Sequence, residues 1–450
     1  MSLRDIVRSI LPPTNRNFEE RMASFDNMLR EMRNENQMLH ESVNELACRI
    51  GDLQRRHRYF NGEYLNLCPS KGEKILIAGW YGANNFGDEL MLKTILSYVP
   101  VERMHQVYVL LWDNESYNRE TLDLRCNVIH YPFSVWDLEA LADSFDVVVW
   151  GGGAILDDEQ YDDDPRNFNT GNLFIRLNEL MLARNKRVYA LGLSANAALE
   201  QPRYIQRLSK IIAYASFFSL RDPYSLKTLE QAGVCCANVV LCEDLAFSHP
   251  DVFQLADIDT FARGKRLGVV LLSTEDSYSD NLSILMSLVQ SNTLQNAGYT
   301  ISMIPFLDED HHDETYYRRL INDLPDAGCP IELEQYTASL KESPLLGCSL
   351  VVSSKYHASL IADVARIPNI SIWSEAHPHY KNKMTYLAET AGVSQTLYSL
   401  SEIRNGSTME DALTGLLDLS TAPSISRDFL KGQSKWLEGV ISDLFLVEDR

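Results

Sequence analysis

Residues 74–89 read KILIAGWYGANNFGDE, and the remaining architecture can be inferred from this pattern and its recurrences along the chain. The four residues that follow Lys74 are apolar without alternation, which predicts a short strand buried on both faces. The glycines after this strand allow the backbone to turn sharply, and the pair Asp88-Glu89 is typical of the first turn of a helix. The stretch therefore predicts a buried strand, a glycine-rich turn and a helix start.

Similar apolar strands alternate with amphipathic helices along most of the chain. The expected strands are 107–112, 145–150, 187–192, 216–220 and 238–242, and, after a polar stretch, 266–272, 299–305, 348–353 and 369–372. Such alternation predicts parallel sheets with helices on both faces, and the restart at residue 266 predicts two α/β domains. We place them at 74–250 and 266–420, with the connection 251–265 between them. The apolar face of a last helix within 421–450 would be covered by crossing back to the first domain.

The first 60 residues predict an α-helical region in front of these domains. Apolar residues recur in heptads from Met22 to Phe60, and Asn36 occupies a core position, where a buried Asn favours a dimer. We therefore expect a coiled coil over 18–60 and a homo-oligomer formed through it; a helix that folds back on the globular part is the alternative. The short amphipathic segment 1–11 is the candidate for peripheral membrane contact. Residues 61–73 read as a linker.

The composition excludes several classes of protein. Of 450 residues, 45% are apolar and 23% are charged, which is typical of a folded globular chain. The net charge of −21 argues against nucleic acid as a partner. The N-terminus lacks the uninterrupted apolar core of a secretory signal, and no run approaches the roughly 18 apolar residues of a membrane span. We expect a cytoplasmic protein, peripheral at the inner face of the membrane if residues 1–11 bind there.

Candidate site residues gather at strand ends, because ligands of open α/β sheets lie beyond the carboxyl ends of the strands. Arg221 ends one strand and offers a planar fork for a carboxylate or phosphate, although an ion pair with Asp222 or a helix cap is the alternative. Lys355 and His357 follow another strand, and an imidazole beside a cation at this place is a candidate acid or base. Lys383 adds positive charge after the last strand of the second domain.

These motifs, in this order, resemble those of the polysaccharide pyruvyl transferase family. The matching stretches are 79–89, 151–158, SLRDPYS at 219–225, EDLAF at 243–247, KYH at 355–357 with the IPNISI that follows, and Lys383. They span roughly residues 74–392. The resemblance implies two Rossmann-like domains that face each other across a cleft, similar to GT-B glycosyltransferases. It also implies transfer of pyruvate from phosphoenolpyruvate to a sugar diol as a cyclic ketal, during synthesis of a bacterial-type cell-surface polysaccharide.

The resemblance assigns roles to individual residues. Phosphoenolpyruvate is the co-substrate, a saccharide is the acceptor, and no further cofactor is implied. The arginine of the family's SxRD motif matches Arg221, and the family's histidine matches His357. Lys355 stands where the family usually has Arg, so the positive charge is kept, but the planar guanidinium that can hold a carboxylate through two parallel hydrogen bonds is lost. We expect Arg221 and Lys355 to hold the carboxylate and phosphate, and a protonated His357 to act as the acid. The other expected substrate-binding residues are Lys383, Gly82, Asn85, Gly152 and Gly153.

Two aspartates complete the predicted catalytic set. Asp88 and Asp244 are candidates to orient or deprotonate the acceptor, with helix capping and loop support as their alternatives. No metal site is expected, because neither the histidines beside Asp313 nor those at 377 and 379 are joined by a predictable third ligand.

Two other functions remain open at this point. A GT-B-like glycosyltransferase would hold the diphosphate of a nucleotide sugar in the same cleft. A noncatalytic scaffold would recruit other enzymes of envelope polysaccharide assembly through its coiled coil.

Overall fold

In a computed structural model of the chain, residues 68–450 form a compact unit, separate from residues 1–67. The residues that the structure describes belong to this compact unit: 72–112, 125–132, 135–159, 161–162, 164, 170–195, 197–256, 264–308, 311–324, 328–375, 378–392, 396–404, 406–417 and 425–445. The predicted amphipathic segment 1–11, the coiled coil 18–60 and all of the linker before residue 72 lie outside the described residues.

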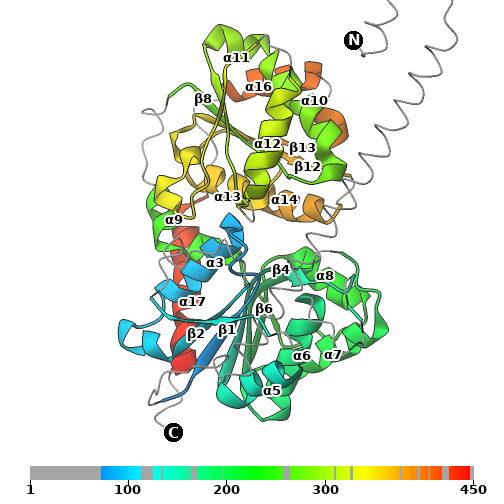
Figure 1. Cartoon of the computed structure of the whole chain (residues 1–450), viewed down its shortest axis with the longest axis vertical. Coiled ribbons are helices and arrows are strands. Elements are labelled where there is room, and N and C mark those ends of the chain that lie inside the picture. Colours follow the sequence, from blue (N-terminus) through cyan, green and yellow to red (C-terminus); the bar gives the residue numbers. More distant parts are fainter. Residues whose placement is uncertain are drawn as a thin grey trace, which may run out of the picture. The chain divides into compact units, whose positions relative to one another are not determined.

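The first half of this compact unit is built on a seven-stranded parallel sheet (Figure 1). Its strands are β1 (Ile75–Ala78), β2 (Val107–Leu111), β3 (Asn127–His130), β4 (Val147–Leu156), β5 (Arg187–Ala195), β6 (Phe217–Leu220) and β7 (Val239–Leu241). Their order across the sheet is β3-β2-β1-β4-β5-β6-β7. The central strands β1, β2 and β4 consist almost entirely of buried apolar residues, as a sheet covered on both faces requires.

Helices cover both faces of this sheet. The helices of this half are α3 (Phe86–Ser97), α5 (Val135–Ser144), α6 (Thr170–Ala183), α7 (Pro202–Tyr214) and α8 (Pro223–Gln231), with short 3₁₀ turns η1 (Val101–Gln106) and η2 (Leu245–Ser248). On one face, α3 packs into a core cluster with β1, β2 and β4. Contacts of α6 with β4 and β5, and of α5 and α7 with α6, place these three helices together.

The second half repeats the arrangement with a six-stranded parallel sheet. Its strands are β8 (Arg266–Val270), β9 (Thr300–Met303), β10 (Ile331–Leu333), β11 (Leu350–Ser353), β12 (Asn369–Trp373) and β13 (Leu397–Ser399), in the order β10-β9-β8-β11-β12-β13. In each sheet the first three strands of the sequence are added one after another toward one edge. The chain then crosses over, and the later strands are added toward the opposite edge. The expected class, two α/β halves each built on a parallel sheet, is confirmed.

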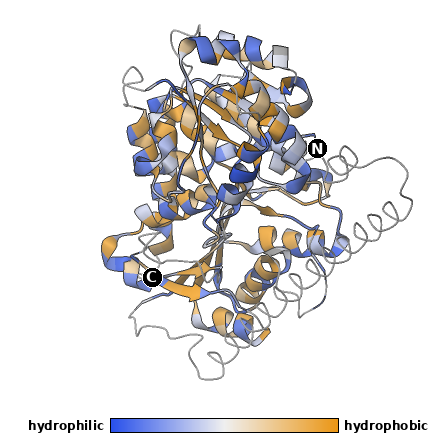
Figure 2. Ribbon diagram, turned by 45° about the horizontal axis from the view of Figure 1, so that its top comes forward, coloured by the Kyte–Doolittle hydropathy of each residue, from blue (hydrophilic) through white to orange (hydrophobic). Residues whose placement is uncertain are grey.

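The helices of the second half form two core layers. They are α9 (Pro250–Leu255), α10 (Tyr278–Val289), α11 (Asn292–Ala297), α12 (His312–Asn322), α13 (Tyr356–Val364), α14 (Pro378–Ala391), α15 (Leu400–Ile403) and α16 (Gly406–Leu417), with short 3₁₀ turns η4 (Glu275–Ser277), η6 (Leu340–Glu342) and η7 (Pro344–Gly347). One layer joins α10, α11, α12 and α16 to the sheet, and the other joins α9, α13 and α14 to it. Figure 2 shows the apolar residues concentrated on the strands and on the helix faces turned toward them.

A shared apolar core connects the two halves. One cluster of buried side chains includes Phe86 and Leu90 of α3 together with Phe306 and residues of α13 and α14. The rings of Phe86 and Phe306 lie 4.6 Å apart, and the Phe86 amide donates to the Phe306 carbonyl at 2.9 Å. An isolated antiparallel bridge joins Asn85 to Leu307. The loop before α3 is thus fixed directly to the loop after β9.

The last helix, α17 (Arg427–Phe445), belongs to the core of the first half. Its residues Leu437, Ile441 and Leu444 are buried in the cluster that contains β1, β2 and α3, and the red helix in Figure 1 runs beside these elements. Nearer its start, Leu430 belongs to the core shared by the two halves. Among the described helices, none combines the length and the apolar character needed to cross a bilayer.

The strand order fixes where a ligand can bind. In each sheet the strand order reverses between two adjacent parallel strands, β1 and β4 in the first sheet and β8 and β11 in the second. The loops that leave these strands at their carboxyl ends diverge to opposite faces, which opens a crevice at that point. Any ligand shared by the two halves should therefore contact the residues that follow β1, β4, β8 and β11.

Candidate active site

A cavity of about 460 Å³ lies where the two crevices meet. The first half contributes Trp80, Asn85, Gly87, Asp88, Ala154, Ile155, Asp157 and Arg221, and the second half contributes Leu272, Ser273, Thr274, Phe306, Leu307, His312, Lys355, Tyr356, His357, Tyr380 and Lys383. Eleven of these nineteen residues lie in the loops or first helical turns after β1, β4, β8 and β11, two lie at the end of β4, and the others, Arg221 among them, follow the neighbouring strands β6, β9 and β12. Of the ten predicted site residues, Asn85, Asp88, Arg221, Lys355, His357 and Lys383 line this cavity.

A single buried carboxylate joins the arginine of the first half to the histidine of the second. Arg221 Nη1 donates to Asp244 Oδ2 at 2.5 Å, and His357 Nε2 lies 3.6 Å from the same oxygen. Arg221 Nε donates to Ser194 Oγ at 3.0 Å, and its guanidinium lies over the ring of Tyr356, 5.2 Å from the centroid. These contacts leave the guanidinium little freedom to rotate. The predicted cation and the predicted acid are therefore brought together.

The charge state of Asp244 follows from its neighbours. Burial by itself would raise the pKa of this carboxyl, but Arg221 and His357 outweigh that effect and hold the pKa well below its usual range. Its other oxygen accepts from the Ala246 amide at 2.9 Å and caps η2. Asp244 is thus a permanent anion that supports a loop as well as the cation. Asp222, the partner that the sequence offered for Arg221, instead caps α8 by accepting from the Ser225 amide.

Gly87 allows the imidazole of His357 to approach the start of α3. A Cβ on Gly87 would lie 1.9 Å from His357 Nδ1, closer than any real contact. Asn85 caps the same helix, since its side chain accepts from the Gly87 amide at 3.3 Å. Glycine is therefore needed at position 87, within the glycine-rich turn predicted from the sequence, because any larger residue would collide with the imidazole of His357, 270 positions away.

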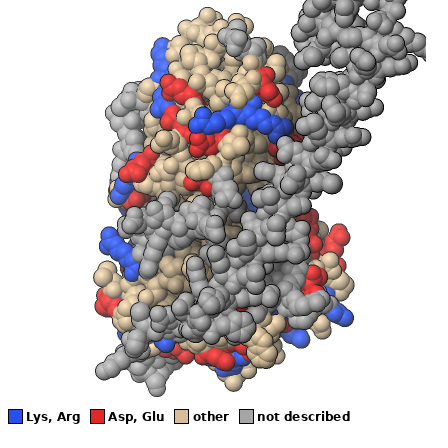
Figure 3. Space-filling view, viewed as in Figure 1, with Lys and Arg blue, Asp and Glu red and all other residues tan. Residues whose placement is uncertain are grey.

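The pKa of Asp88 is raised toward neutral pH, and the pKa of Lys383 is lowered toward neutral pH. Burial raises the pKa of Asp88 to about 6, although His357, Arg221 and Lys383 oppose the rise. Burial lowers the pKa of Lys383 to about 7, and Arg221 lowers it further. Both groups therefore change charge near neutral pH, as groups that exchange protons in catalysis often do. The face shown in Figure 3 carries acidic and basic side chains near one another, whereas Arg221 and Lys383 are only 5% and 7% exposed.

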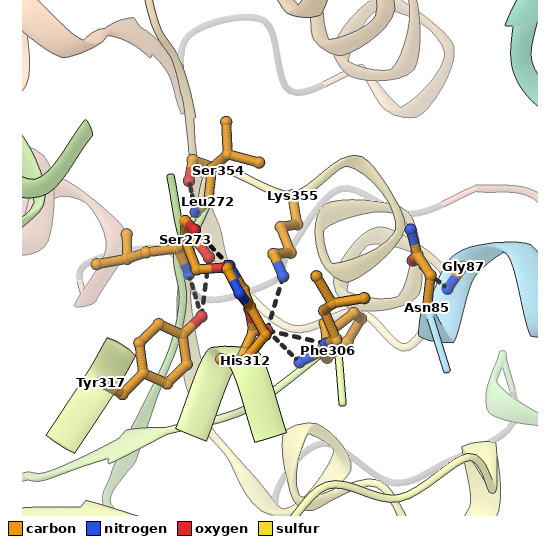
Figure 4. A network of polar contacts seen from close by, with 12 residues as sticks. Asn85, Gly87, Leu272, Ser273, Phe306, His312, Tyr317, Ser354 and Lys355 are labelled. Atoms are coloured by element: carbon orange, nitrogen blue, oxygen red, sulfur yellow. Dashed lines mark hydrogen bonds and ion pairs between the residues drawn. The ribbon is translucent and has the colours of Figure 1, made fainter. Parts of the chain in front are cut away.

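Lys355 is held by a carboxylate that the sequence did not assign to the site. Its ammonium contacts Asp313 Oδ2 at 2.7 Å, and Asp313 is completely buried at the start of α12. Figure 4 shows the side chain of Lys355 pointing toward Phe306. The Phe306 and Leu307 amides donate to the same oxygen at 2.7 and 2.9 Å, and the Ser273 hydroxyl donates to the other oxygen. The adjacent His312 contacts the Ser273 carbonyl through Nε2 at 2.7 Å. Asp313 thus organises the loops after β8 and β9.

Glu89 is a second acidic residue whose role could not be seen in the sequence. It is 1% exposed, and its Oε1 accepts from the Gly82 amide at 2.7 Å. Burial raises the pKa of Glu89 to about 8, although the Gly82 amide opposes the rise. The only signal in the sequence was its place in the first turn of a helix, where an exposed acidic residue would also be expected.

The three remaining predicted residues are glycines that do not belong to the described lining of the cavity. A Cβ on Gly82 would lie 3.0 Å from the backbone of Trp112, and one on Gly152 would lie 2.8 Å from Met91 Sδ. Gly153 has a φ of +117°, and a Cβ there would lie 3.1 Å from Asp88 Oδ1. These contacts explain why glycine is needed at each position. Their part in substrate binding stays a prediction.

Several solved structures share this fold at low sequence identity. HepE of Anabaena, solved with UDP-glucose, has a TM-score of 0.53 at 11% identity, over 83% of this chain and 99% of that chain. MnaA of S. aureus, solved with UDP, gives 0.54 at 10% over 83% and 98%. The UDP-GlcNAc 2-epimerase of Methanocaldococcus jannaschii gives 0.51 at 14% over 83% and 99%. At such identities the likeness establishes the GT-B-like fold alone.

A comparison of the sequence with models of protein families identifies the family. No curated protein matches the chain. The model of one family, described as polysaccharide pyruvyl transferase, matches residues 85–375, which include Asp88, Arg221, Asp244, Lys355 and His357. This match covers well over half of the chain. The chain therefore belongs to the polysaccharide pyruvyl transferase family.

Proposed function

We propose that the protein transfers pyruvate from phosphoenolpyruvate to two hydroxyl groups of a saccharide, with formation of a cyclic ketal and release of phosphate. Membership of the family supports a transferase. The observation that carries the proposal is the convergence of cationic side chains from both halves on one cavity. Arg221 comes from the first half, and Lys355 and Lys383 come from the second. A small ligand with a carboxylate and a phosphate is the kind of molecule that such a group of cations binds.

The donor would be held by cations that the protein has already oriented. Arg221 is fixed by Ser194 and Asp244, and Lys355 by Asp313, so neither needs to lose much side-chain freedom on binding. Each still lines the cavity. Lys383, with a pKa lowered to about 7, would regain its full charge beside a phosphate, because a nearby anion favours the protonated form.

His357 is the acid in the proposed reaction. Its proton passes to the methylene carbon of phosphoenolpyruvate, which becomes the methyl group, and C2 becomes electrophilic. One saccharide hydroxyl then attacks C2 and gives its proton to Asp88, and the bond between C2 and the phosphate oxygen breaks. The second hydroxyl attacks C2 and closes the ketal, and its proton returns to the neutral imidazole of His357; the proton on Asp88 leaves with the phosphate. The anion of Asp244, 3.6 Å from Nε2, helps to orient the imidazole for this transfer.

We place the saccharide acceptor against lining residues that the first half contributes to the cavity, namely Trp80, Ile155 and Asp157. Trp80 and Ile155 provide apolar surface there, and Asp157 provides a carboxylate that can accept hydrogen bonds from sugar hydroxyls. An anionic donor would be repelled by Asp157, whereas a neutral polyhydroxylated ligand would not. Asp88, with a pKa raised to about 6, can accept the proton that a sugar hydroxyl loses.

Glycosyl transfer from a nucleotide sugar is the second candidate. The solved structures of similar fold include complexes with UDP and UDP-glucose. The same cations could hold a diphosphate. The two candidates differ in the donor that protects the protein and in the product that is released, so binding and turnover separate them. A scaffold without catalysis would bind neither donor.

The decisive experiment follows phosphate release from phosphoenolpyruvate by the purified full chain with a panel of saccharide acceptors. We expect acceptor-dependent phosphate release, and thermal protection by phosphoenolpyruvate that UDP-sugars do not give. His357→Ala should abolish turnover without lowering Tm, whereas His105→Ala, at an exposed position in η1, should leave it unchanged. Protection by a UDP-sugar alone would refute the proposal, and turnover retained by His357→Ala would remove that residue from the acid role.

A further inference from the structure

Asp313 is fully buried and accepts four hydrogen bonds, one of them from a lysine that lines the cavity. Three donors meet on Oδ2: the Lys355 ammonium at 2.7 Å and the amides of Phe306 and Leu307 at 2.7 and 2.9 Å. The Ser273 hydroxyl donates to Oδ1. Figure 4 shows Lys355, Phe306 and Ser273, three of the residues that donate these bonds, close to one another. A carboxylate so completely surrounded is fixed in one orientation.

The loop that Asp313 holds is also the loop that contacts the first half. The Phe306 carbonyl accepts from the Phe86 amide, and Leu307 forms the bridge with Asn85. Asn85 caps α3, the helix that begins at Phe86 and has Gly87 and Asp88 in its first turn. One carboxylate oxygen therefore connects the cavity lysine, the loop after β9 and, through that loop, the start of α3.

We propose that Asp313 is a positioning residue for donor binding, which holds the Lys355 ammonium at a fixed point of the cavity relative to the first half. This inference rests on the proposed function. A lysine reaches its ligand through a flexible four-carbon stem, and its charge is not spread over a rigid fork. Asp313 takes one of its three N–H groups and leaves the others free to meet the donor. The anchor thus gives Lys355 the fixed direction that an arginine fork would provide by its own geometry.

The variant Asp313→Asn separates this role from support of the loops. An amide oxygen in the place of Oδ2 can still accept from the Phe306 and Leu307 amides. The new NH₂ group would face the Ser273 hydroxyl, which can rotate and accept. The tethers of both loops are thereby retained, and what is lost is the negative charge that holds Lys355.

We expect Asp313→Asn to raise KM for phosphoenolpyruvate about tenfold, since a hydrogen bond between charged groups contributes about that factor. KM for the acceptor should stay within about twofold, because the lining residues placed against the acceptor belong to the first half. The effect should vanish when Lys355 is already replaced, so that Asp313→Asn adds less than about twofold to Lys355→Met. A residue that merely supports the fold would instead alter both KM values and act independently of Lys355.

Asp251→Asn is the matched control. Asp251 also holds a lysine, Lys341, at 2.9 Å, but neither residue belongs to the described lining of the cavity. This variant should leave both KM values unchanged. If Asp313→Asn does not fold, Asp313→Glu tests the same point, because the charge is kept and displaced by one methylene; KM for phosphoenolpyruvate should then rise while KM for the acceptor does not.

The outcomes separate the inference from the function on which it rests. Wild-type protein that does not consume phosphoenolpyruvate would refute both. Wild-type turnover together with additive effects of Asp313→Asn and Lys355→Met would overturn the positioning role and leave the function standing. An unchanged or lower KM for phosphoenolpyruvate in Asp313→Asn, or in Asp313→Glu where that variant is used, would overturn the positioning role as well.

Discussion

The substitution Gly87→Ala should disable the enzyme by moving His357. Gly87 is a residue of α3 and does not have the positive φ that would itself exclude alanine. The added Cβ would lie 1.9 Å from His357 Nδ1, 2.5 Å from Cε1 and 2.6 Å from Cγ. Because Cβ contacts under 3.0 Å essentially do not occur, the imidazole must withdraw by at least about 1.1 Å, the difference between 3.0 and 1.9 Å.

The catalytic cost follows from this displacement. A reacting group moved by about 1 Å from its productive position costs roughly 100-fold in rate. We therefore expect kcat for phosphate release to fall about 100-fold or more. The folded state should survive, because alanine is the better helix former by about 1 kcal/mol, which offsets part of the cost of moving the ring.

Steady-state phosphate release and a thermal melt measure the two effects separately. Gly439→Ala in α17 is the control. Apart from its two chain neighbours and the backbone of its own helix, no described atom would lie within 4 Å of the added Cβ. The control should keep wild-type kcat. If Gly87→Ala keeps kcat within about threefold and melts like the wild type, then the close approach of His357 to α3 is not needed for the reaction, and the assignment of His357 as the acid loses its geometric basis.

Three further results are expected. Glu89 has a pKa raised by burial from 4.5 to about 8, so the folded protein retains a proton that the unfolded chain has lost; the contribution of Glu89 to the free energy of unfolding is greatest below pH 4.5 and falls by about 1.4 kcal/mol per pH unit until pH 8. Measured by denaturant, the free energy of unfolding of the wild type should therefore fall between pH 5.5 and 7.5 by about 2.8 kcal/mol relative to that of Glu89→Gln, and equal changes in the two proteins would contradict the reasoning. For turnover, kcat/KM for phosphoenolpyruvate should rise as Asp88 ionises near pH 6 and fall as Lys383 loses its proton near pH 7, with the alkaline limb moved upward in Lys383→Arg. A profile that stays flat to pH 9 would argue against a charged Lys383. Finally, Trp80→Ala should raise KM for the saccharide several-fold and leave KM for phosphoenolpyruvate unchanged, and the opposite split would place the acceptor elsewhere.

The sequence predicted the strands that carry a continuous apolar run and missed three that do not. Each expected strand overlaps an observed one: most are central parallel strands that are apolar on both faces, and the exposed edge strand β7 was also found because its residues, VVL, are apolar. Three strands were not predicted, β3, β10 and β13, and each lies at the edge of its sheet. Most of their residues are only partly buried, so their sequences carry no apolar run by which a strand could be recognised.

Site residues could be predicted where one short stretch of sequence contains a recognisable motif. They could not be predicted where the role of a residue depends on contact with a distant segment. The motifs around Arg221 and His357 were recognised one by one, and their common partner Asp244 was itself a candidate. The pairing of Lys355 with Asp313, 42 residues apart, has no local signature, and in the sequence Asp313 stood out only beside two histidines. Burial of Glu89 was equally invisible, since a helix that begins with Asp and Glu is ordinarily solvated at that end.

The return of α17 to the first sheet has a consequence for biosynthesis. The face of that sheet which α17 covers stays open on the ribosome until residues 427–445 have emerged, long after the strands themselves have been made. Domains commonly fold as they are synthesised, at about 5–20 residues per second. Here roughly 200 residues separate β7 from the helix that completes its half, so the nascent chain exposes an apolar face for about 10–40 seconds. Cotranslational chaperones would have their longest opportunity to bind during that interval.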